Sequence, residues 1–140
     1  MVDSDVLLSL ISSVEPPELA DRFRLHASRP HATSLAVAEV YAALSLGVAG
    51  LTAERRRNAF TSILETTMKR RILPFDMSCA ETLARLSRTP VKGGSPPYTL
   101  AALIHAATAQ RFELVLLTSR PEQYEGLGIG AAAVDLATFG

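Results

Sequence analysis

Residues 1–11 read Met-Val-Asp-Ser-Asp-Val-Leu-Leu-Ser-Leu-Ile, so a short apolar start meets Asp3 and Asp5 before a longer apolar stretch begins. A strand that ends on an acid and turns directly into a helix places that acid at the carboxyl edge of a sheet, where open α/β sheets build their sites. Two carboxylates at this spacing can hold a divalent metal ion. Aspartate is also a favourable N-cap, so the same two residues can instead begin a helix near Val6.

The composition favours one globular domain over residues 1–140. The chain has 48% hydrophobic and 20% charged residues and a formal net charge of +0, which argues against disorder and against a strongly basic nucleic-acid binder. Cys79 is the single cysteine, so we expect no intramolecular disulfide. The acidic start does not fit a signal peptide and no apolar run reaches a membrane-spanning length, so we expect a cytoplasmic protein.

Strands and helices are expected to alternate, which predicts a three-layer α/β/α domain with a central parallel sheet. We expect strands at residues 2–3, 73–75 and 114–118 to be parallel neighbours, with a last strand at 132–136. Helices are expected at residues 6–11, 17–27, 34–46, 52–69, 76–86 and 98–110, with Leu100 buried in the last of them. Thr33 or Ser34, Thr52 and Asp76 are the expected caps.

Glu39 is an exception within the apolar run of residues 35–44. A lone carboxylate in such a run costs free energy unless it has a partner. Glu39 therefore either faces a cluster of acids with a cation between them, or points to solvent from the narrow polar side of its helix.

Other polar groups have simpler interpretations. The basic runs at residues 55–57 and 69–71 are expected to form a solvated face or, alternatively, a surface that contacts the phosphates of RNA or DNA. His26 and His31 lie among loop and helix-end residues, and we interpret both as solvated rather than as ligands.

Six short segments together resemble a PIN domain, and within it the VapC-type toxins and plasmid-stability proteins. They are DSDVL (3–7), AVAEV (36–40), LPFD (73–76), LAA (100–102), LTS (117–119) and YEGL (124–127). Each segment is weakly specific by itself. Their order and spacing over essentially the whole chain carry the resemblance.

The resemblance implies a metal-dependent endoribonuclease that holds Mg²⁺ or Mn²⁺ at the carboxyl edge of its sheet, where an activated water attacks a phosphodiester. Asp3 matches the family's first acid and Glu39 its second. Asp5 matches a supporting position, and Thr118 matches the hydroxyl at the end of the late strand. We expect the carboxylates of Asp3 and Glu39 to lie within about 4 to 6 Å of each other if they share a cation.

Two positions depart from the family. Its third acid falls before the late helix, where this chain has Pro97. Its fourth acidic position, two residues after Thr118, is Arg120, a cation that could reach into the groove and neutralise the other acids. Glu122 is the nearby acid that could substitute, and Mg²⁺ can still be held by one or two carboxylates with water and substrate.

The family also implies a homodimer, a small cognate antitoxin laid across the acidic groove, and an RNA substrate. The first strand is short for the family, which suggests a true start further upstream. One alternative is an eroded PIN-like module that binds an antitoxin or RNA without cleaving. Another is a phosphatase of the haloacid-dehalogenase type, which needs a lysine that is missing after Ser119.

Overall fold

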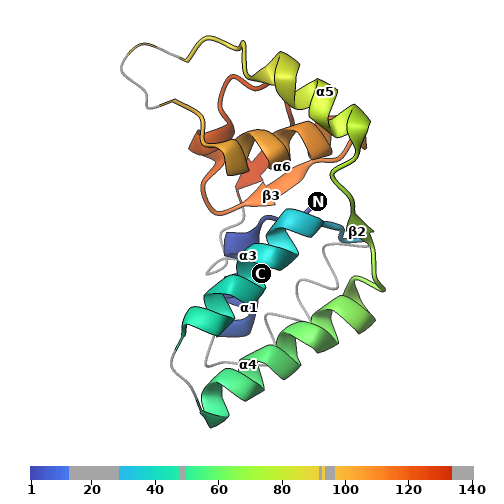
Figure 1. Ribbon diagram of the computed structural model, residues 1–140, viewed down its shortest axis with the longest axis vertical. Coiled ribbons are helices and arrows are strands. Elements are labelled where there is room, and N and C mark those ends of the chain that lie inside the picture. The colour runs from blue at the N-terminus through green and yellow to red at the C-terminus, as the bar shows by residue number, and fades with distance from the viewer. Residues whose placement is uncertain (13–28, 48–49, 92, 94–96, 134–140) are drawn as a thin grey trace.

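A parallel sheet runs through the centre of the computed structural model, which describes residues 1–12, 29–47, 50–91, 93 and 97–133 (Figure 1). Strand β1 (Ala32–Thr33) pairs with β2 (Ile72–Leu73), and β3 (Leu116–Thr118) pairs with β4 (Ala131–Ala133). Val2 joins the two pairs through parallel bridges to Ala32 and Leu117. The order across the sheet is therefore β2, β1, Val2, β3 and β4, with every pairing parallel as predicted.

The prediction that residues 2–3 and 73–75 are direct neighbours was wrong, because β1 lies between them. Thr33 was interpreted only as a helix cap. It does cap a helix, accepting a hydrogen bond from the Ala36 amide, but it also ends a strand of two buried residues. So short a strand has no alternating pattern that a sequence could display.

Helices cover both faces of the sheet. Figure 1 shows α1, α3 and α4 on one side and α5 and α6 on the other, which gives the three layers that were predicted. The bounds are α1 (Ser4–Ser12), α3 (Ser34–Leu46), α4 (Leu51–Ser62), the π-helical turn η1 (Ile63–Thr67), α5 (Met77–Leu86), α6 (Leu100–Arg111) and the 3-10 turn η2 (Pro121–Tyr124).

Side-chain N-caps begin α5 and α6, as Thr33 does for α3. The side chain of Asp76 accepts a hydrogen bond from the Cys79 amide at the start of α5, as predicted. Thr99 does the same for α6 through the Ala102 amide. Thr52, by contrast, is not a cap: α4 begins at Leu51, after Gly50 with a φ of 124° and no side-chain cap.

Two apolar clusters form the core. One joins α1, α3, α4 and the adjoining strand residues, and its largest fully buried side chains are Phe60, Leu7 and Met68. The other joins α5, α6, β3 and η2 around Leu103, Leu116 and Tyr124. Leu100, predicted to be buried, is 65% exposed because it is the first residue of α6.

The remaining predictions concern His31, the helix at 17–27, the last strand and membrane-spanning helices. His31 is half-buried rather than solvated, and its Nδ1 atom has no hydrogen-bond partner among the described residues. The helix expected at 17–27, with His26, and residues 134–136 of the last expected strand lie outside the described residues. In the part of the chain that the structure describes, no helix has the length and apolar character needed to cross a membrane.

Candidate metal centre

Three side chains from three separate elements meet at the carboxyl edge of the sheet. Asp3 follows Val2 directly, Glu39 comes from α3, and His105 comes from α6. One ligand atom from each lies within 4.8 Å of the others. The Asp3–Glu39 separation therefore agrees with the distance expected from the sequence.

Asp3 is buried and held by a set of hydrogen-bond donors. Its Oδ2 atom accepts from the Tyr124 hydroxyl at 2.7 Å and from the Thr118 hydroxyl at 3.1 Å. Its Oδ1 atom accepts from the Ser4 amide at 2.7 Å and lies 3.5 Å from Nε2 of His105. Tyr124, Thr118 and His105 lie far along the chain from Asp3. The Asp3 side chain is therefore a point where distant segments meet, and not only a cap for α1. Its Oδ1 atom is the oxygen that faces His105.

Tyr124 supplies one of these donors. In the sequence it was noted only as part of the YEGL segment, residues 124–127. Burial raises its pKa above the ordinary phenol value, and the charge of Asp3 raises it further. The hydroxyl therefore keeps its proton at neutral pH and serves as a permanent donor to Asp3.

Glu39 turns toward the cluster rather than away from it. Its side chain is 32% exposed, and Oε2 lies 3.2 Å from Nε2 of His105. Of the two interpretations left open by the sequence, the structure therefore supports the one in which Glu39 faces other polar groups. A carboxylate in this position has both a partner inside the protein and access to solvent.

His105 is the residue that the sequence analysis missed. It lies in the buried middle of α6, among small residues such as Ala102, Ala106 and Ala109, and is only 2% exposed. Its Nδ1 atom lies 3.1 Å from the Thr33 hydroxyl. An imidazole surrounded by alanines on one face of a helix was the available signal, since a buried ionisable group needs a partner.

Asp5 belongs to a second, adjoining group at the end of β3. Its Oδ1 accepts from the Val6 amide, while its Oδ2 accepts from the amide and the hydroxyl of Ser119. Arg120 lies with its Nε atom 3.5 Å from Oδ2 of Asp5, and its side chain is half-exposed. The alternative in which Arg120 reaches in to neutralise Asp3 and Glu39 is not what the structure shows: its ion pair is with Asp5, at the rim.

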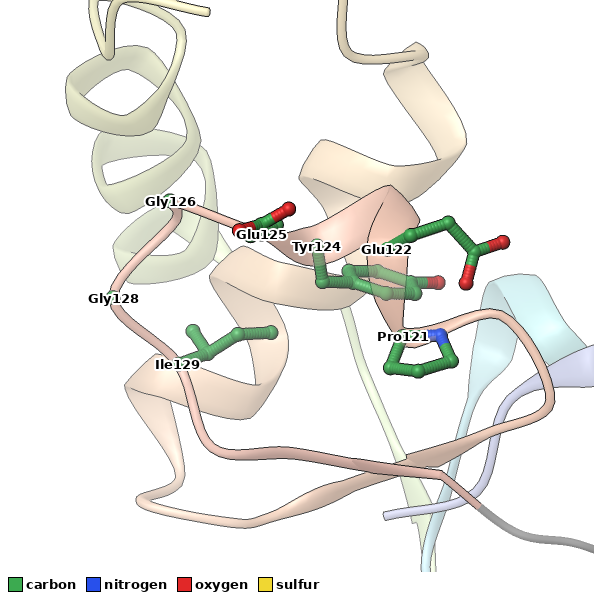
Figure 2. A pocket seen from close by; sticks show the side chains of 7 residues that line it. All are labelled: Pro121, Glu122, Tyr124, Glu125, Gly126, Gly128 and Ile129. Atoms are coloured by element: carbon green, nitrogen blue, oxygen red, sulfur yellow. The ribbon is translucent and has the colours of Figure 1, made fainter. Parts of the chain in front are cut away.

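The two remaining predicted positions, Pro97 and Glu122, are exposed. Pro97 is exposed and precedes α6, and the side chain that α6 contributes to the cluster is His105. Glu122 is exposed on η2 and lines an open pocket of about 450 Å³ with Tyr124 and Gly128. Figure 2 shows its carboxylate and the Tyr124 hydroxyl pointing to the same side of the turn.

Two solved structures are similar to this chain over nearly its full length. The structure of FitAB bound to the IR36 DNA fragment has a TM-score of 0.77 and 19% sequence identity, covering 94% of this chain and 92% of that chain. The crystal structure of FitAcB from Neisseria gonorrhoeae has a TM-score of 0.70 and 21% identity, covering 93% of this chain and 94% of that chain. Both contain a PIN-domain toxin of a toxin–antitoxin system. The chain has the PIN fold.

No family model and no curated protein matches the sequence. At this level of identity, the similarity to FitAB and FitAcB establishes the fold alone. The PIN fold places Asp3, Glu39 and His105 at the sheet edge, where they offer two carboxylate oxygens and one imidazole nitrogen. Such a donor set fits a divalent cation of the first transition row, and its carboxylates also fit Mg²⁺.

Proposed function

We propose that this chain is a VapC-like toxin of a type II toxin–antitoxin (plasmid stability) system and acts as a metal-dependent endoribonuclease. The observation that carries the proposal is the convergence of Asp3, Glu39 and His105 within 4.8 Å at the carboxyl edge of a parallel sheet with the PIN fold. Asp3 and Glu39 are the residues that would hold Mg²⁺ or Mn²⁺, together with His105. A toxin that acts on RNA works in the cytoplasm, where we place this protein.

The chemistry divides between the cation and the chain. Asp3, Glu39 and His105 would hold a divalent cation, which would supply Lewis-acid chemistry toward a phosphodiester and a water of lowered pKa. Tyr124 and Thr118 fix the Asp3 carboxylate from behind, so that Oδ1 faces the cluster. Arg120 is half-exposed at the rim, where its guanidinium can take a phosphate of the RNA backbone.

Support for a partner protein comes from the two similar structures, in which the PIN-domain toxin is bound to an antitoxin. The surface around Glu39 is the one that a small antitoxin would cover, because Glu39 is the member of the cluster with appreciable exposure. We also propose a homodimer, as the family implies. Sedimentation at micromolar concentration should give a dimer, and a monomer alone would contradict this part.

A second candidate function is a PIN-like module that binds its antitoxin or RNA without cleaving. It is favoured by Arg120, which stands where the family has an acidic residue and whose ion pair ties up Asp5. In this alternative the fold and the antitoxin surface are kept while turnover is lost.

RNA cleavage separates the two candidates. Purified protein freed of antitoxin should cleave single-stranded RNA with Mn²⁺ or Mg²⁺ and lose this activity with a chelator. Asp3→Asn and Glu39→Gln should each abolish cleavage while the folded state persists. Glu54→Gln, on the exposed face of α4, is the matched control and should cleave like the wild type. If the wild type binds its antitoxin but no metal condition yields cleavage, the non-cleaving module is the correct assignment.

A further inference from the structure

The contacts of His105 indicate which class of metal ion the site binds. The imidazole is 2% exposed and touches polar groups through both ring nitrogens. Its Nε2 atom lies 3.2 Å from Oε2 of Glu39 and 3.5 Å from Oδ1 of Asp3. Its Nδ1 atom lies 3.1 Å from Oγ1 of Thr33.

The hydrogen positions follow from what each partner can do. A carboxylate only accepts hydrogen bonds, so the face that Nε2 presents to Glu39 and Asp3 needs either a ring hydrogen or a cation. The Thr33 hydroxyl, by contrast, can donate to Nδ1 or accept from it. Its oxygen already accepts from the Ala36 amide at 2.9 Å and retains a second lone pair. Thr33 therefore satisfies the imidazole in either tautomer.

We propose that His105 is a metal ligand through Nε2, and that it makes this site selective for transition-metal dications such as Mn²⁺, Co²⁺ or Zn²⁺ over Mg²⁺. The inference rests on the metal site of the proposed function and adds the identity of the metal class. Imidazole nitrogen suits transition metals, whereas Mg²⁺ is held by oxygen ligands. A site made of carboxylates alone would have a weaker preference, because carboxylate oxygens suit Mg²⁺ as well as Mn²⁺.

The geometry suits this role. Ligand atoms about 2.0 to 2.2 Å from an ion are spaced roughly 2.8 to 3.1 Å apart in an octahedral arrangement and roughly 3.3 to 3.6 Å apart in a tetrahedral one. The two separations from Nε2, 3.2 and 3.5 Å, lie within the span of these values. When Nε2 binds an ion, the ring hydrogen belongs on Nδ1, where the Thr33 hydroxyl accepts it. Ligating histidines generally have such a partner on the other nitrogen.

Thr33 is accordingly a positioning residue. It orients the ring of His105 and accepts its hydrogen without touching the ion. It also caps α3, the helix that carries Glu39. A single hydroxyl therefore sets the direction of one ligand and begins the helix of another.

The first test measures metal binding alone, with no RNA present, so that its failure is distinct from a failure to cleave. The wild type, stripped of metal, is titrated with Mn²⁺, Zn²⁺ and Mg²⁺ by calorimetry, and with Co²⁺ by visible absorption. We expect transition metals to bind more tightly than Mg²⁺. His105→Ala should weaken Mn²⁺ binding by more than about 100-fold, since removing even an outer partner of a ligand costs 10- to 100-fold.

Matched variants separate ligation from packing. His31→Gln removes an imidazole outside the cluster and should leave Mn²⁺ affinity unchanged. His105→Asp replaces the nitrogen ligand by oxygen and should shift the preference toward Mg²⁺. Thr33→Val should weaken Mn²⁺ binding about 10- to 100-fold, whereas Thr33→Ser keeps the hydroxyl and should bind nearly as the wild type does. Equal affinity of the wild type for Mg²⁺ and Mn²⁺ would overturn the proposal.

A measurement on the wild type covers the case in which the His105 variants fail to fold. Nitrogen-15 NMR of labelled histidine side chains reports which ring nitrogen carries hydrogen and which binds metal. On addition of Zn²⁺, we expect one imidazole to hold its hydrogen on Nδ1 and its metal on Nε2. The His26→Gln and His31→Gln variants assign that signal to His105 by elimination, since the chain has three histidines. Zn²⁺ binding that leaves the His105 signals unmoved, or no binding at all, would refute His105 as a ligand.

Discussion

The Tyr124 hydroxyl donates a 2.7 Å hydrogen bond to Oδ2 of Asp3, although 121 positions separate the two residues. Both side chains are buried, at 4% and 3% exposure. The bond ties η2, near the end of the described chain, to the first acid of the candidate metal centre. Because the acceptor is a carboxylate, such a bond is among the stronger ones in a protein.

Tyr124→Phe removes this hydroxyl and keeps the ring. We expect the free energy of unfolding to fall by about 1.5 to 3 kcal/mol, the range for hydrogen bonds to charged groups. Urea denaturation followed by circular dichroism measures the change. Tyr41→Phe is the control, because Tyr41 is 38% exposed and its ring packs edge-on against Phe60. An equal loss in the two variants would mean that the bond to Asp3 contributes nothing specific.

The same contact predicts an alkaline pH dependence. Burial first, and the charge of Asp3 second, raise the pKa of Tyr124 in the folded chain above the ordinary value of 10.0. Above about pH 10 the unfolded chain releases this proton while the folded chain retains it, so the free energy of unfolding falls as pH rises. Below that pH both states keep the proton and the group adds no pH dependence.

Denaturant melts between pH 9 and 11 test this. The wild type should lose stability more steeply than Tyr124→Phe, by at most about 1.4 kcal/mol per pH unit from this one group. Parallel pH profiles for the two proteins would show that Tyr124 ionises equally in both states.

Much of the fold follows from local chemistry. The caps Thr33 and Asp76 were recognisable because a hydroxyl or carboxylate before an apolar helix has few other uses. The pairing of Asp3 with Glu39 was foreseeable because the first sits at a strand end and the second interrupts an apolar run. In each case the reason lies within a few residues of the side chain.

The features that the sequence did not predict depend on contacts between residues far apart in the chain. His105 belongs to the metal centre only because α6 packs beside α3. The residues next to His105 in the sequence do not indicate this contact between the two helices. Arg120 could have reached Asp3 and Glu39, but it pairs with Asp5, which the pairing of Val2 with β3 brings within reach. The two-residue strand β1 has no periodicity, so its place between Val2 and β2 is a property of the assembled sheet.

Arg120→Ala tests the corrected position of this side chain. Its pair with Asp5 is half-exposed at 3.5 Å, so we expect a loss of about 0.2 to 1 kcal/mol in stability, reduced further by salt. Mn²⁺ affinity should stay within about twofold, because the ion pair of Arg120 is with Asp5 rather than with a ligand and screening weakens its field. Arg120→Asp should be less stable than Arg120→Ala, since it sets a second carboxylate against Asp5. Tighter metal binding by Arg120→Ala would instead mean that Arg120 acts on the centre.

Phe60 anchors the core on the α4 side of the sheet. It is fully buried and meets the Tyr41 ring at a centroid distance of 5.1 Å. Phe60→Ala should lower the free energy of unfolding by about 3 to 5 kcal/mol, because it removes apolar burial and leaves a cavity. Phe75→Ala, at a ring that is 40% exposed, is the matched control and should lose much less. Similar losses would contradict the packing described for α4.

Thr118 joins the two acidic groups, and its substitution tests whether they act together. The side chain is fully buried at the end of β3. Its hydroxyl donates to Oδ2 of Asp3 at 3.1 Å, and its oxygen accepts from the Arg120 amide at 3.1 Å. Valine has nearly the same shape and can make neither bond.

Thr118→Val should therefore lower the free energy of unfolding by about 1 to 3 kcal/mol, because it removes a donor to a buried carboxylate. It should also weaken Mn²⁺ binding by about 10- to 100-fold, as expected when a group that orients a ligand is lost. Thr118→Ser retains the hydroxyl and should bind Mn²⁺ nearly as the wild type does, with only a modest loss of stability from the missing methyl. If Thr118→Val binds Mn²⁺ like the wild type while losing stability, then Tyr124 and the Ser4 amide orient Asp3 without help from Thr118.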